Sequence, residues 1–122
     1  MRKPLLVLLF GLLVGLVSRD AEAHAQLRAS DPAVGSTVSA SPAQIRLVFS
    51  EGIEPKFSGV AITDADGKTV DAAPLALDPA DRKQVVVALP SPLAPGTYKV
   101  AWHVVSVDTH KTQGAFTFTI KP

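Results

Sequence analysis

The sequence predicts an all-β domain of about seven strands, arranged as an antiparallel sandwich or small barrel. Short runs rich in Val, Ile, Thr and aromatic residues are separated by turn residues, which is typical of such folds. No long stretch has the 3.6-residue periodicity of a helix. Nine of the ten prolines follow residue 23 and disfavour helices there. These three observations indicate one compact β domain.

The first two strands have clear boundaries. The run HAQLRAS at residues 24–30 ends at the turn sequence DPAVGS. The run AQIRLVFS at residues 43–50 alternates apolar and polar residues, as a half-buried strand does. Its core face is predicted to carry Ile45, Leu47 and Phe49.

The middle of the chain predicts two further strands around a segment without a clear pattern. The run FSGVAITDADG at residues 57–67 is expected to end in a turn at residues 64–67. The run KQVVVALP at residues 83–90 is stopped by prolines. Between them, a short strand around residues 69–71 is one option for the segment 68–83.

Two long runs complete the predicted fold. PGTYKVAWHVVSVD at residues 95–108 starts from a Pro-Gly turn, and GAFTFTI follows at residues 114–120. Because successive side chains of a strand point to opposite faces, Tyr98 and Trp102 are predicted to face the core. His103 is predicted to face away from them, as a structural or surface residue.

Residues 1–23 are predicted to be a secretory signal peptide. Two basic residues precede an apolar run of 13 residues, Leu5–Val17, and a small-x-small triplet ends at Ala23. The alternative is a membrane anchor, but spanning a bilayer takes about 20 apolar residues. Cleavage after Ala23 would release a mature exported domain, residues 24–122, that begins with His24.

Composition excludes several partners and metals. Residues 24–122 carry nine Lys and Arg against nine Asp and Glu, so no basic surface points to nucleic acid or anionic lipid. The chain has no Cys, and its only Met is Met1. We therefore expect a domain held by an apolar core without disulfides. Any metal site must use nitrogen and oxygen ligands, which argues against Cu(I), iron–sulfur and thiolate-zinc sites.

Cleavage after Ala23 would turn His24 into a different kind of ligand. Its free α-amino group, which titrates near pH ~8, would belong to the same residue as an imidazole. The amine nitrogen and ring Nδ1 can then close a chelate ring on one metal ion. The alternative is that His24 merely follows the cleavage site, because short motifs often match by chance.

The last part of the run 95–108 becomes polar. Alternation continues the core face from Val104 through Ser106 to Asp108 and His110. An extended chain would therefore place the Asp108 carboxylate beside the His110 imidazole, where both can reach one ion or bond to each other. The alternative is a polar strand end, with Asp108 capping a turn and His110 in solvent.

Together with the His24 amine and imidazole, these two side chains would provide three nitrogens and one oxygen. Tetragonal Cu(II) prefers such a planar set, and Cu(II) also binds most tightly in the Irving–Williams order. Zinc could use the same groups in tetrahedral geometry. Calcium and magnesium are disfavoured because they require more oxygen ligands.

Several segments of the chain resemble the CopC family of periplasmic copper-resistance proteins. The resemblance covers essentially the whole predicted mature chain. It rests on an S-x-P-x-x-G opening, an L-x-F-S-E strand and a closing W-x-V-V-S-x-D-x-H-x-x-x-G-x-F-x-F segment. It implies a Greek-key β-barrel of the cupredoxin-like kind and a Cu(II) site whose ligands would be His24, Asp108 and His110.

Glu51 corresponds to the acidic residue that closes the family's F-S-E segment. That residue has been associated with the metal site. Glu51 is therefore a candidate outer-shell partner that orients the His24 amine or a ring N–H. The alternative is a solvated loop carboxylate.

The chain departs from the family pattern at three places. Residues 51–95 contain no Met and no His, whereas many relatives have a Met-rich loop that forms a Cu(I) site. Thr109 stands where the family commonly has Gly between Asp and His, and we expect a β-branched residue there to favour extended backbone and to exclude positive φ. His103 stands where relatives often carry Arg.

Three classes of function are compatible with these features. The first, which we favour, is a non-enzymatic, monomeric periplasmic protein that binds Cu(II) and sequesters or delivers it. The resemblance implies an inner-membrane copper transporter of the CopD type as its partner. The second is a histidine-brace copper redox enzyme, which would need an open ligand position. The third is a metal-free, immunoglobulin-like interaction module.

Overall fold

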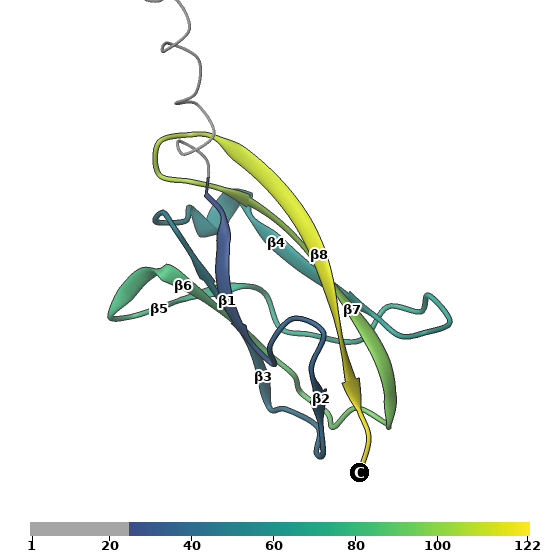
Figure 1. The fold of residues 1–122 in the computed structure, drawn as a ribbon. Helices are drawn as coiled ribbons and strands as arrows, with labels where there is room; N and C mark the ends of the chain where they lie inside the picture. The colour runs from purple at the N-terminus through teal and green to yellow at the C-terminus, as the bar shows by residue number, and fades with distance from the viewer. Residues whose placement is uncertain (1–24) are drawn as a thin grey trace, which may run out of the picture.

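The computed structural model describes residues 25–122, which form two facing four-stranded sheets (Figure 1). The predicted signal peptide and His24 lie outside the described residues. Within residues 25–122, no helix is long and apolar enough to cross a bilayer. The all-β prediction is therefore confirmed.

The first sheet is antiparallel throughout and has the strand order β1-β3-β6-β5. Its strands are β1 (Leu27–Asp31), β3 (Gln44–Phe49), β6 (Asp81–Ala88) and β5 (Ala76–Asp78).

The second sheet has the strand order β2-β8-β7-β4. Its strands are β2 (Thr37–Val38), β8 (Lys111–Ile120), β7 (Gly96–Val105) and β4 (Gly59–Thr63). One short 3₁₀ turn, η4 (Pro55–Phe57), precedes β4. The strand orders of the two sheets are those of an immunoglobulin-like Greek-key sandwich, with β2 added at one edge.

Two strands were not predicted, and one pairing differs from the expected antiparallel arrangement. β2 has two residues and pairs with β8 in parallel, while β5 has three residues. Segments this short carry no periodic pattern, so only their pairing with distant strands defines them. In the optional strand at 69–71, Thr69 forms no more than an isolated bridge with Thr63. The turn at 64–67 is confirmed, with Gly67 at a φ of 82°.

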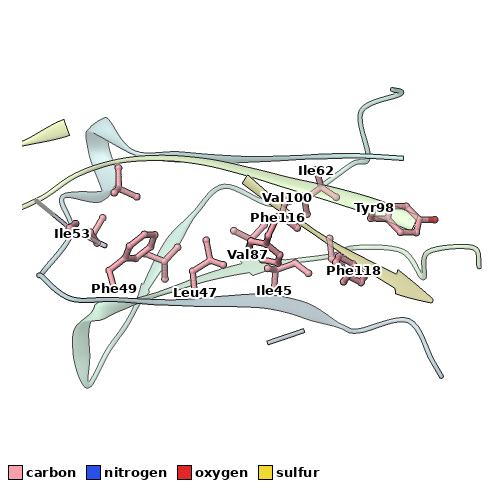
Figure 2. Close-up of a cluster of buried hydrophobic side chains, with 14 of the residues drawn as sticks. Ile45, Leu47, Phe49, Ile53, Ile62, Val87, Tyr98, Val100, Phe116 and Phe118 are labelled. Atoms are coloured by element: carbon pink, nitrogen blue, oxygen red, sulfur yellow. The ribbon is translucent and has the colours of Figure 1, made fainter. Parts of the chain in front are cut away.

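The core lies between the two sheets (Figure 2). The predicted face of β3 is buried as expected, since no residue of the set is more than 1% exposed: Ile45, Leu47 and Phe49. Near the start of β7, the buried Tyr98 donates a hydrogen bond from its hydroxyl to the carbonyl of Ala94, at 2.7 Å. This contact is the tyrosine corner typical of such sandwiches.

One end of the sandwich gathers three segments that are far apart in the sequence. The start of β1, the η4 turn and the loop from β7 to β8 lie at the same end (Figure 1). The segment after β3 joins them, because Ile53 pairs with Ser106. The predicted site residues of the described chain all come from this end.

Candidate metal centre

A tight loop between β7 and β8 holds the Asp-x-His pair. The strands pair in register as far as Val105 and Lys111. The Ser106 N–H then donates to the His110 carbonyl at 2.9 Å, and the Thr109 N–H donates to the Ser106 carbonyl at 2.8 Å. The hairpin therefore closes on a three-residue loop, and such loops usually end in a residue with left-handed backbone.

Thr109 occupies that left-handed position, with a φ of 72°. The expectation that Thr109 is extended was therefore wrong. The register of two ten-residue strands fixes where the hairpin turns, and this outweighs the preference of a single β-branched residue. The bend, rather than strand alternation, brings the two flanking residues together.

Asp108 and His110 lie side by side across this bend. Nδ1 of His110 is 3.1 Å from Oδ2 of Asp108, and the two side chains are 43% and 42% exposed, respectively. The pair is therefore partly buried yet open to solvent on one side. A carboxylate and an imidazole in this arrangement suit Cu(II) or Zn(II) as ligands.

Ser106 orients the Asp108 carboxylate. Its side chain is fully buried, and its hydroxyl donates to Oδ1 of Asp108, which leaves Oδ2 facing His110. Strand alternation predicted Ser106 on the core face but did not indicate that it would orient Asp108. The local signal was the spacing S-x-D, at which a hydroxyl and a carboxylate readily bond across a turn.

The same contacts change the acidity of Asp108. The hydrogen bond from Ser106 holds the pKa of the Asp108 carboxyl below its usual value. Partial desolvation opposes this change, and the adjacent His110 adds to it. Asp108 is therefore a carboxylate at neutral pH and is ready to accept a cation.

Among residues 25–122, no group of three or more His, Cys, Asp or Glu side chains converges on one point. Asp108 and His110 are thus two donors, and a complete metal site needs at least one more. Glu51 does not join them in such a group. It lies nearby, because its neighbour Gly52 accepts a 2.9 Å hydrogen bond from the Val107 N–H of the loop.

His24 lies outside the described residues, but the residue that follows it is placed. The carbonyl of Ala25 accepts a 2.9 Å hydrogen bond from the Thr112 hydroxyl, and Ala25 is 1% exposed. Thr112 lies on β8 and follows His110, which directly precedes this strand, by two residues. The chain therefore begins its described path next to the Asp108–His110 pair. No pattern in the sequence indicated this role for Thr112.

The other predicted residues of β7 lie as expected. Trp102 is on the core face, with its ring edge-on to Phe49 at a centroid distance of 5.1 Å. His103 is exposed on the outer face, opposite Gly59 of β4. Its ring occupies the space that a Cβ at Gly59 would need, 2.6 Å from Cε1. His103 therefore points away from the pair.

Comparison with known proteins gives one consistent result. A family model described as the CopC domain matches residues 27–121. Protein YobA of Escherichia coli K12 is 46% identical over 110 residues, which cover 90% of this chain and 89% of YobA. Copper resistance protein C of Pseudomonas syringae pv. tomato is 42% identical over 111 residues, 87% of each chain.

The fold comparison agrees with these matches. The crystal structure of CopC from Methylosinus trichosporium OB3b superimposes with a TM-score of 0.76 at 32% identity. The superposition covers 81% of this chain and 95% of that one. Sequence and fold thus indicate the same family.

Proposed function

This chain belongs to the CopC family, and from that premise we propose that its exported form binds one Cu(II) ion and sequesters or delivers it in the periplasm. The proposed ligands are the α-amine and imidazole of His24, the Asp108 carboxylate and the His110 imidazole. The copper ion is the cargo of the protein in this proposal, and its role would be copper resistance or homeostasis.

The observation that carries this proposal is the placement of two chain segments. Nδ1 of His110 is 3.1 Å from Oδ2 of Asp108. Ala25, the neighbour of His24, accepts a hydrogen bond from Thr112, which follows His110 by two residues in the sequence. Two proposed ligands and the residue that follows the third therefore lie at one end of the sandwich. The donor set contains no sulfur, which supports Cu(II) rather than Cu(I).

The proposal depends on where export cleaves the chain. Mass spectrometry of the exported protein should find His24 as its first residue. An added residue before His24 would convert the amine into an amide, so the extended protein should bind Cu(II) much more weakly. Electron paramagnetic resonance titration of both forms measures this difference, and equal affinity would refute the chelate.

The side-chain ligands have a matched control within the same chain. His110→Gln should abolish tight Cu(II) binding because it removes an imidazole donor. His103→Gln removes the same kind of side chain from the outer face of β7, so it should leave affinity unchanged. Unchanged affinity in His110→Gln would exclude His110 as a ligand, and failure of the unmodified protein to bind copper would favour the metal-free interaction module.

We propose that the protein is not an enzyme. Asp108 would fill the in-plane position that a histidine-brace oxidase keeps open for its co-substrate. The copper-loaded protein should therefore produce little peroxide with ascorbate and cleave no glycan. Sustained turnover in either assay would favour the enzymatic alternative.

Glu51 stays a candidate outer-shell residue. Its position next to Gly52, which is bonded to the loop at Val107, supports this role. Glu51→Gln should then weaken Cu(II) binding about tenfold or more, as losses of outer-shell partners do. Unchanged affinity would indicate a solvated loop carboxylate.

We propose an inner-membrane transporter of the CopD type as the copper recipient of a monomeric protein. Two exposed apolar side chains at the site end, Phe57 at 64% and Val107 at 49% exposure, support docking of a partner there. Phe57→Ser with Val107→Ser should slow copper transfer to membranes carrying such a transporter without changing Cu(II) affinity. Unchanged transfer would argue against this surface.

A further inference from the structure

We propose that Thr112 and Ser50 are positioning residues that hold the first residues of the mature chain so that residue 24 is presented to Asp108 and His110. This inference rests on the proposed function, because it concerns how the amine-bearing end of the chain is delivered to the copper site. Neither side chain is a metal ligand in this scheme. Their role is to restrict the conformations of the segment that carries one.

Thr112 anchors the carbonyl of residue 25. Its hydroxyl donates to the Ala25 carbonyl at 2.9 Å across 87 positions of sequence. The Ala25 side chain is 1% exposed and belongs to the apolar core, so this residue is held by packing as well as by the bond. Thr112 is the second residue of β8, and His110 directly precedes that strand, so only Lys111 separates the anchor from the proposed ligand.

Ser50, which directly follows β3 of the first sheet, anchors the next residue. The Gln26 N–H donates to the Ser50 hydroxyl at 2.9 Å, and the Ser50 N–H donates to the Gln26 carbonyl at 2.9 Å. Pairing of β1 with β3 begins one residue later, at Leu27 and Phe49, and its register shifts before Ala29. Without these bonds, residues 25 and 26 would be the end of a strand, where chains commonly fray.

Thr112 lies on a strand of the second sheet and Ser50 directly follows a strand of the first, and they bond to consecutive residues. Residue 24 is therefore attached to a segment whose backbone direction is set before any metal arrives. Such preorganisation lowers the conformational entropy lost on binding. Loss of one anchoring hydrogen bond should weaken Cu(II) binding about three- to tenfold, by the usual net value of such a bond.

The test compares three threonine variants of the mature protein. Thr112→Val keeps the side-chain shape and removes the donor, so it should weaken Cu(II) affinity, and Thr112→Ser should restore it. Thr119→Val is the matched control, because Thr119 lies on the same strand and loses only a 3.0 Å contact with Thr97. The control should leave Cu(II) affinity unchanged.

A metal-free readout tests Ser50 separately. In Ser50→Ala the Gln26 N–H loses its acceptor, so its hydrogen exchange in the apoprotein should accelerate, while amides inside β3 keep their protection. An unchanged exchange rate at Gln26, or an affinity equal to that of the unmodified protein, would overturn the role of Ser50.

A double-variant cycle separates this inference from the proposed function. One residue added before His24 removes the amine that Thr112 is proposed to help present, so Thr112→Val should have little further effect in the extended protein. If extension weakens binding but Thr112→Val does not, only the positioning role fails. If extension has no effect, the amine chelate itself fails and the positioning role fails with it.

Discussion

Nδ1 of His110 lies 3.1 Å from Oδ2 of Asp108, across a loop whose last residue, Thr109, has a φ of 72°. The geometry that brings these two side chains together is therefore a left-handed bend. A threonine in this conformation is strained, because its Cβ approaches the following carbonyl. The pair is held together at a cost to local stability.

Replacement of that threonine should make the protein more stable. Glycine has no Cβ penalty at positive φ, although it adds backbone entropy to the unfolded chain, so Thr109→Gly should gain about 0.5–1 kcal/mol. Urea unfolding of the apoprotein measures the gain. As a control, Thr117→Gly within β8 should be destabilising, and a loss of stability in Thr109→Gly would contradict the strained-loop account.

Loss of the Ser106 hydroxyl should change the acidity of the site. Because its hydrogen bond lowers the pKa of Asp108, Ser106→Ala should raise that pKa towards the usual value for Asp. Carboxyl-carbon NMR titration of the apoprotein detects this directly. In the proposed copper site, protonation of Asp108 competes with the metal, so acidification should also release Cu(II) at a higher pH in the variant. An unchanged Asp108 titration would show that the hydrogen bond from Ser106 does not determine the pKa of Asp108.

The ion pair between Arg46 and Asp78 should give a pH-dependent contribution to stability. Nη1 of Arg46 donates to Oδ2 of Asp78 at 2.8 Å, and this bond lowers the pKa of Asp78. A lowered folded-state pKa stabilises the protein above the ordinary Asp pKa of about 3.9, and the benefit disappears as pH falls through the lowered value. Arg46→Met should therefore lose stability at neutral pH, with a difference that shrinks in acid.

The surface pair of Arg82 and Glu54 provides the control for that series. It has the same 2.8 Å separation, but its side chains are 60% and 41% exposed, so solvent screens it more strongly. Arg82→Met should change stability less than Arg46→Met when both are unfolded with urea across the pH range. Equal effects would indicate that the greater burial of the Arg46 pair has no influence.

Because the Trp102 ring of β7 packs closely against β8, Gly114 of β8 should not tolerate a side chain. A Cβ at Gly114 would lie 2.5 Å from Cζ2 and 2.9 Å from Cε2 of the indole. Gly114→Ala should destabilise the protein by about 1–3 kcal/mol, as overpacking does. Thermal unfolding measures this, and the penalty should be smaller in a Trp102→Phe background because the clashing ring is absent. If Gly114→Ala is equally destabilising in that background, the strain does not come from contact with the Trp102 ring.

Local patterns in the sequence were sufficient for the long strands and their buried faces. Ile45, Leu47 and Phe49 could be assigned to the core because strand alternation depends only on neighbouring residues. The pairing of Asp108 with His110 was also predicted, although for a wrong reason. Their spacing was read as strand alternation, whereas a hairpin bend brings them together.

Only the tertiary structure decided which distant segments meet. β2 is defined by its pairing with β8. The position of Ala25 is fixed by a hydrogen bond from Thr112, which is 87 positions away in the sequence. The left-handed backbone of Thr109 likewise follows from the register of β7 and β8 and not from the residue itself. Contacts between residues far apart in sequence depend on how the whole chain packs, so no short stretch of sequence specifies them.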